Sequence, residues 1–98
     1  NFRVVAAITG PELDADGLLC DFHTVQDLLG AILEPFQNRN LNEVAPFDRL
    51  NPSAEEIARH IAHRLHESLD GALSPYGAKV SWVSVTEAPG CLAIYRAL

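Results

Sequence analysis

The stretch KVSWVSVTEAPGCLAIYRAL, residues 79–98, predicts the last secondary-structure elements of this sequence. Two runs rich in β-branched and aromatic residues, 79–87 and 91–98, are typical of strands. They are joined by Ala88, Pro89 and Gly90. Pro-Gly suits the two central positions of a type II turn, because proline presets the first φ and glycine accepts the positive second one. The stretch therefore predicts a β-hairpin.

The segment ahead of the hairpin predicts a helix. Either Asn51 caps it with Pro52 in the first turn, or Ser53 caps it with Glu56 reaching back, and both alternatives start it within two residues. One apolar stripe with a four-residue spacing follows: Ile57, Ile61, Leu65 and Leu69. We expect the helix to run to about Leu69 and a turn-rich loop to occupy 70–78.

The first half of the chain predicts one strand and one helix. Residues 2–9, FRVVAAIT, are apolar at both alternating sets of positions, as in a strand covered on both faces. Gly10, Pro11 and Gly17 indicate a loop over 10–17. A helix is expected from Asp21, with Thr24 as a second possible cap, and Pro35 should end or kink it. Its buried face is predicted to hold Val25, Leu28, Leu29 and Ile32.

These elements predict an α+β fold, in which a three-stranded sheet lies under two helices. So small a sheet leaves edges that pair outside the chain, so we expect an oligomer. With 98 residues there is room for one domain. Because the chain contains no methionine and enters a strand directly after Asn1, we expect it to be a piece of a longer polypeptide.

Composition narrows the class of function. No apolar run approaches the roughly 20 residues of a membrane-spanning helix. A net charge of −6 argues against nucleic acid or an anionic membrane as the main partner. The two cysteines, Cys20 and Cys91, form no C-x-x-C pair, so a reducing compartment such as the cytoplasm is expected. Both have apolar neighbours and are interpreted as small buried residues without chemistry.

The local sequence around the titratable residues gives little indication of a catalytic or metal site. His60, His63 and His66 fall on the second helix opposite its apolar stripe, and a solvated polar face explains them better than a metal site does. His23 is interpreted as a helix-start or interface residue. Glu87 ends a strand on the side of Val83 and Val85, where local sequence alone favours a solvated glutamate.

Longer motifs resemble one known family. They are LDADGLLCDFHTVQDLL (13–29), NRNLNEVAPFDRLNPSAEEIARHIAHRL (38–65) and VSWVSVTEAPGCLAIYRA (80–97). This pattern is similar to the 6-pyruvoyl tetrahydropterin synthase family, which includes the 6-carboxytetrahydropterin synthases of the queuosine pathway. The most specific elements of the resemblance are the residue pair 21–22, the runs 40–42 and 51–55, and Glu87 with its proline turn.

The resemblance implies the tunnelling fold, with strands pooled into a barrel and two trimers stacked into a homo-hexamer. Residues 1–98 would be a single such domain, incomplete at its N-terminus. The family removes the triphosphate of dihydroneopterin triphosphate and rearranges or cleaves the side chain. It uses zinc on three histidines, a cysteine base and an Asp-His pair. The histidines and the cysteine lie upstream of the strand that begins here with NFRVV, so this chain would supply no ligand to the expected zinc.

The resemblance also assigns roles to four residues. Gln37 and Asn38 occupy the positions of the Asp-His pair, and carboxamides do not exchange protons near neutral pH. Glu87 matches the family's pterin-anchoring glutamate, and Ser53 is expected to bind substrate. We therefore expect a pterin-metabolising lyase whose acid-base pair is replaced. The alternative is a non-catalytic or divergent hexamer that binds pterin without turning it over.

Overall fold

A computed structural model of the chain describes residues 2–13, 16–73 and 77–96. Its elements are β1 (Arg3–Thr9), α1 (Phe22–Leu33), η1 (Glu34–Phe36), η2 (Leu41–Glu43), α2 (Ala54–Leu73), β2 (Lys79–Ala88) and β3 (Cys91–Arg96), where η denotes a 3-10 helix. The order strand, helix, helix, strand, strand confirms the predicted α+β class. Parts of the predicted loop and of the predicted last strand, residues 74–76 and 97–98, lie outside the described residues.

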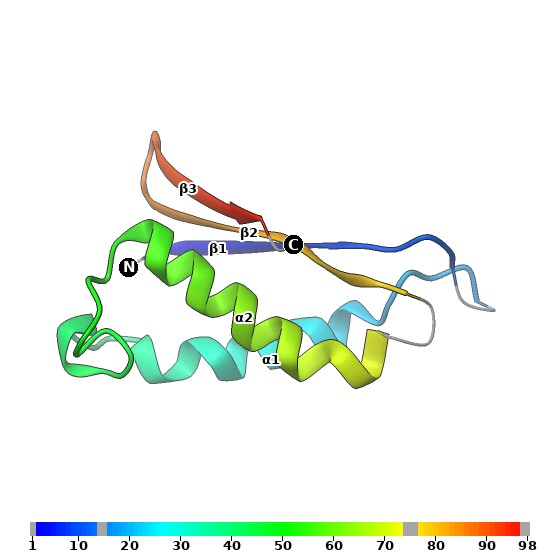
Figure 1. Ribbon diagram of the computed structural model, residues 1–98, viewed down its shortest axis with the longest axis horizontal. Coiled ribbons are helices and arrows are strands. Elements are labelled where there is room, and N and C mark those ends of the chain that lie inside the picture. The colour runs from blue at the N-terminus through cyan, green and yellow to red at the C-terminus, as the bar shows by residue number, and fades with distance from the viewer. Residues whose placement is uncertain (1, 14–15, 74–76, 97–98) are drawn as a thin grey trace.

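The sheet is antiparallel, with strand order β1-β2-β3. Both helices lie along one of its faces, so the chain forms two layers (Figure 1). The other face is open in that neither helix covers it: Val5, Ser84 and Ile94 pair across the three strands there. Val5 and Ile94 are 46% and 50% exposed, while Ser84 between them is 6% exposed. The prediction that β1 is covered on both faces is therefore wrong for this chain, because its two helices share one side of the sheet.

The core lies between α2 and the centre of the sheet. Ile57, Ile61, Leu65 and Leu69 are each at most 2% exposed, which confirms the predicted stripe. They meet Val83 and Val85 of β2, which have no exposed surface. Fully burying one such aliphatic side chain stabilises the fold by about 1.5–3 kcal/mol. In α1 Val25 is buried, while the other predicted core positions of that helix are half-buried.

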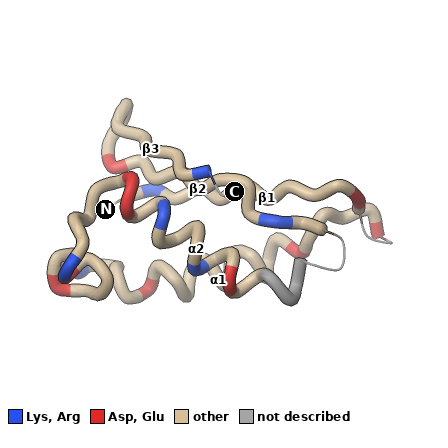
Figure 2. Tube along the Cα trace, in the orientation of Figure 1, with Lys and Arg blue, Asp and Glu red and all other residues tan. Residues whose placement is uncertain are grey.

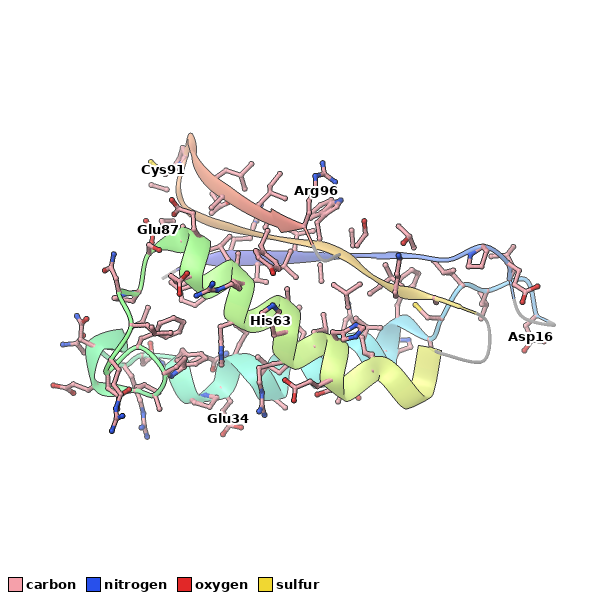
Figure 3. All side chains as sticks on the ribbon, in the orientation of Figure 1. Asp16, Glu34, His63, Glu87, Cys91 and Arg96 are labelled. Carbon is pink, nitrogen blue, oxygen red and sulfur yellow. The ribbon has the colours of Figure 1, made fainter. Side chains whose placement is uncertain are left out.

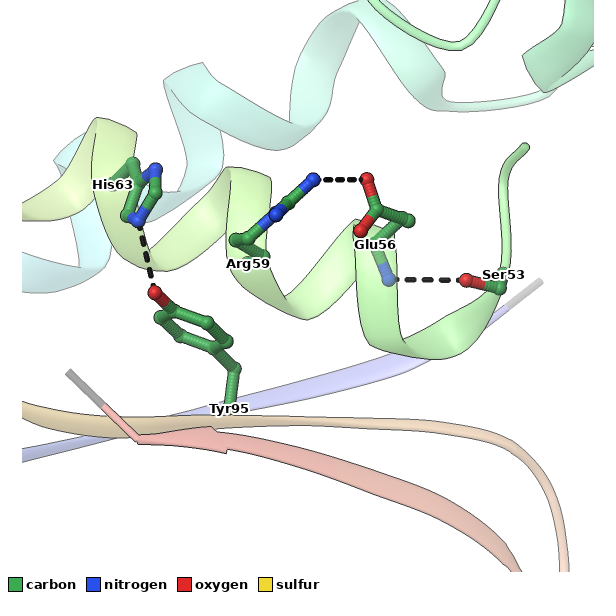
Figure 4. A network of polar contacts seen from close by, with 5 residues as sticks. All are labelled: Ser53, Glu56, Arg59, His63 and Tyr95. Carbon is green, nitrogen blue, oxygen red and sulfur yellow. Dashed lines mark hydrogen bonds and ion pairs between the residues drawn. The ribbon is translucent and has the colours of Figure 1, made fainter. Parts of the chain in front are cut away.

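Side-chain caps decide between the two predicted starts of each helix. Asp21 caps α1, since its Oδ1 accepts a hydrogen bond from the backbone N–H of His23 at 2.9 Å. Ser53 caps α2, since its Oγ accepts from the N–H of Glu56 at 3.1 Å. The Glu56 carboxylate pairs with Arg59 (Figure 4).

The C-terminal ends of α1 and α2 can be compared with the predicted ends. The α-helix α1 stops at Leu33, and Pro35 lies inside η1, as proline in the first turn of a helix allows. The α2 helix continues to Leu73, so the prediction of an end near Leu69 is wrong. A single glycine, Gly71, costs a helix only about 1 kcal/mol, and no proline follows Leu69 until Pro75.

The hairpin forms as predicted. Ala88 pairs with Cys91, which leaves Pro89 and Gly90 as the two-residue turn. Gly90 has a φ of +81°, which matches the second central position of a type II turn. Next to the turn the register shifts between Thr86 and Ala88, so Glu87 is the extra residue of a β-bulge.

Acidic residues and Lys or Arg residues are both spread along the described chain, and α2 carries residues of both kinds (Figure 2). Within the described residues, no helix combines the length and the apolar character that crossing a membrane requires.

Candidate functional site

The segment between the helices is rich in asparagine, partly because its backbone conformation and its capping hydrogen bonds favour this residue. Asn38 has a φ of +56°, in the left-handed region that asparagine tolerates better than most residues. Asn40 caps η2, because its Oδ1 accepts from the backbone N–H of Asn42 at 3.1 Å. Gln37 is the C-cap of η1, and its N–H donates to the carbonyl of Glu34 at 3.2 Å. Backbone geometry therefore explains some of this unusual composition without any chemistry.

Gln37 and Asn38 also line a cleft. Its volume is about 260 Å³, and Phe2, Leu33 and Phe36 also line it. Both carboxamides are exposed, so they are open to a ligand. Because Phe2 immediately precedes β1, the chain enters the sheet at the rim of this cleft. We call it the amide cleft below.

Glu87 lies at a second cavity, of about 380 Å³. Its carboxylate is exposed on the bulge of β2, where the hairpin approaches the first turn of α2 (Figure 3). Ala54 and Glu55 line this cavity from the helix, and Cys91 lines it from β3. The carboxylate is thus held at the edge of a hollow large enough for part of a small heterocycle. We call it the glutamate cavity.

The two cavities share no lining residue in the described chain. The hairpin turn, the start of α2 and the loop after α1, which contribute lining residues to these cavities, lie toward the same end of the molecule (Figure 1). One chain therefore does not bring Glu87 and the pair Gln37-Asn38 into a single site.

Ser53 has a structural role. The half-buried side chain holds the N–H of Glu56, which satisfies one of the free donors at the start of α2. Its hydroxyl hydrogen stays available to donate, so capping and contact with a ligand are compatible.

The histidines differ from one another. The ring of His63 is hydrogen-bonded to the Tyr95 hydroxyl, with Nε2 and Oη 3.1 Å apart, and so connects α2 to β3 (Figure 4). His60 is half-buried and packs edge-on against two phenylalanines, so the expectation of a fully solvated face is wrong for this residue. His23 and His66 are exposed. In the part of the chain that the structure describes, no three His, Cys, Asp or Glu side chains are placed to hold a metal ion.

The cysteines also differ. Cys20 is half-buried, and burial, followed by the neighbouring charge of Asp21, raises the pKa of its thiol. A raised thiol pKa disfavours the nucleophilic thiolate, which agrees with an inert residue. Cys91 is exposed, so its interpretation as a buried residue is wrong. It starts β3 beside the turn and lines the glutamate cavity.

Sequence reasoning missed a cluster of three rings. Phe36 ends η1, Phe47 follows η2, and the rings lie 5.5 Å apart between centroids. His60 of α2 contacts both, at 5.7 and 5.6 Å. The sequence does place a phenylalanine on each side of the polar loop. Whether the two rings meet could not be predicted from that pattern, because their contact with His60 depends on how α2 packs.

Comparison with models of known protein families gives a match over the whole chain. The family model described as 6-pyruvoyl tetrahydropterin synthase matches residues 1–98. No curated protein matches the chain significantly.

Proposed function

Because the chain belongs to the 6-pyruvoyl tetrahydropterin synthase family, we propose that it binds a reduced pterin through Glu87 and is a divergent lyase of this type. The family consists of lyases of pterin metabolism that are typically oligomeric. The proposed substrate is dihydroneopterin triphosphate or a related pterin. The proposed acid-base positions carry Gln37 and Asn38 in place of Asp-His.

The placement of Glu87 carries this proposal. A carboxylate has two oxygens, which can accept the paired N–H donors on the guanidine-like edge of a pterin ring. Such a bidentate contact fixes the orientation of the ring as well as adding affinity. Glu87 is exposed at a cavity and belongs to a bulge, a feature that often re-aims a side chain at a functional site.

The carboxamides favour a second candidate function. Gln37 and Asn38 line a cleft and are accessible, but neither side chain can relay a proton near neutral pH. They can still hydrogen-bond a ligand. The alternative is therefore an oligomer that binds pterin without turning it over.

We propose that the site is completed by neighbouring copies in a hexamer built from two trimers. Two observations support this arrangement. The amide cleft and the glutamate cavity share no lining residue within the described chain, as expected if another copy completes each of them. The open sheet face also exposes large apolar side chains, including Leu92 at 57% and Ile94 at 50%.

Zinc remains an expectation for the intact protein. The described residues do not fit a zinc site, because no three suitable ligands come together. The resemblance assigns its ligands to histidines ahead of the first strand. The roles proposed for the residues of this chain are therefore binding and positioning of the pterin, and none of them involves the metal.

Titration with a reduced pterin tests the proposal. The variant Glu87→Ala should lose about 2–5 kcal/mol of binding free energy, which is roughly a 30- to 5,000-fold loss of affinity. The matched control Glu12→Ala removes an exposed carboxylate from the loop after β1, and it should bind as the wild type does. Unchanged affinity in Glu87→Ala would show that the pocket lies elsewhere. Steady-state turnover of dihydroneopterin triphosphate then separates the lyase from the non-catalytic alternative.

A further inference from the structure

The cluster of Phe36, Phe47 and His60, called the ring clamp below, closes the loop that carries Gln37 and Asn38. Phe36 lies directly before Gln37 and is 7% exposed, while Phe47 lies at the far end of the loop and is 2% exposed. His60 comes from α2 and contacts both rings. Both ends of the loop are thus held against one imidazole.

Phe36 connects the ring clamp to the amide cleft. It lines that cleft together with Gln37 and Asn38, and it also lines a separate cavity of about 320 Å³ together with His60 and Arg64. A movement of Phe36 toward or away from His60 therefore changes the wall of the amide cleft. The imidazole can influence the cleft without touching a ligand in it.

We propose that His60 is a positioning residue for the candidate site: its neutral ring completes the clamp, and protonation of the ring loosens the loop that carries Gln37 and Asn38. This inference relies on the proposed function only in that the ligand of the site is taken to be a pterin. The clamp itself is a property of the fold.

The surroundings of His60 favour the neutral ring. Burial lowers the pKa of this histidine, and the charges of Arg64 and His63 lower it further, against an opposing effect of Glu67. These three groups lie on α2. The residues that α1, η1 and the following loop contribute to the shared cavity are alanine, isoleucine, proline and phenylalanine, none of which titrates. No carboxylate among those cavity residues compensates a proton on the ring.

The sign of the effect follows from the lowered pKa. When the loop is open, His60 is solvated and binds its proton near the usual pKa of about 6.5; when the loop is closed, it binds the proton at lower pH. Closure is therefore fully stabilised above about pH 6.5, and this stabilisation is lost as the pH falls through the pKa of the closed form. Between the pKa of the closed form and about pH 6.5, one proton changes the opening equilibrium by at most about tenfold per pH unit.

Amide hydrogen exchange, corrected for intrinsic rates, measures this opening between about pH 5 and pH 8, where histidine titrates. The N–H groups of Glu43 and Val44 are suitable probes, because each donates to a loop carbonyl at 3.0 Å. In the wild type their protection should fall as the pH drops below about 6.5. Amides at the centre of β2, such as that of Val83, should not show this dependence.

Three variants separate titration from packing. His60→Phe keeps an aromatic ring and should keep the loop protected at every pH, without the loss at low pH. His60→Ala should open the loop at every pH, again without a pH dependence. The matched control His66→Phe makes the same change at an exposed position of α2 and should retain the wild-type profile.

Several results would overturn the inference. One is a wild-type pH profile that persists in His60→Phe. Another is loop protection that increases as the pH falls, which would mean that cation–π attraction to the phenylalanines dominates. Unchanged protection in His60→Ala is a third.

A parallel pterin titration keeps the two proposals apart. Exchange as expected without pterin binding at any pH would refute the proposed function and leave the ring clamp intact. Pterin binding with identical exchange profiles in wild type and His60→Phe would refute the ring clamp alone.

Discussion

Restoring a titratable pair at residues 37 and 38 is the most direct test of how this chain differs from its family. The double change Gln37→Asp with Asn38→His should increase turnover at saturating substrate. General acid-base catalysis contributes about 10²- to 10⁴-fold in rate. At about 1.36 kcal/mol per tenfold, the restored pair should lower the barrier by roughly 3–5 kcal/mol.

The structure predicts that the fold tolerates this change. Both side chains are exposed, and surface substitutions usually shift stability by no more than about 0.5 kcal/mol. The left-handed backbone at Asn38 is the main concern, since its φ is +56°. Histidine is enriched in this region, as asparagine is, so the substitution avoids most of the roughly 1–2 kcal/mol that other residues lose there.

The assay is steady-state turnover for the wild type, the double variant and the two single variants at equal zinc content. The single changes should each gain less than the pair, because an acid-base relay acts as a unit. Pterin affinity should barely change, since Glu87 is untouched. The double variant should also acquire a pH-rate profile with the limbs of a titrating pair. A wild type already as fast as ordinary family members, or a double variant without any gain, would refute the assignment of this loop.

Three further predictions concern stability and assembly. Ser53→Ala removes the cap of α2 and should cost about 1 kcal/mol in urea unfolding, whereas Ser68→Ala, exposed within the same helix, should cost less; equal losses would contradict the capping role. Leu65→Ala, at a position with no exposed surface, should cost about 2–5 kcal/mol in the same assay. Light scattering should show a trimer or hexamer that Ile94→Lys weakens, and a wild-type monomer at all concentrations would rule out the barrel.

Local sequence patterns were sufficient to predict most of the helices, strands and turns. The turn at Pro89 and Gly90 forms because those residue types preset its dihedral angles, whatever surrounds them. The apolar spacing of α2 predicted its buried stripe, because helical geometry places residues four apart on one face. The end of the same helix was predicted less well, since a lone glycine such as Gly71 stops a helix only when the context agrees.

The candidate site was predicted unevenly. Glu87, Ser53, Gln37 and Asn38 were selected through the resemblance, since their local sequence favoured plain structural roles. Their assignment to binding or catalysis remains a prediction. The structure adds that Gln37 and Asn38 share one cleft, that Glu87 sits on a bulge at another, and that Ser53 caps α2.

The sequence by itself determined which segments become helices and strands, because those preferences depend on neighbours a few positions away. Only the tertiary structure decided that Cys91 is exposed and that α2 continues past Leu69 to Leu73. It alone brought His60 between Phe36 and Phe47. Such contacts join residues that are distant along the chain, and they depend on how whole elements pack, which no local pattern encodes.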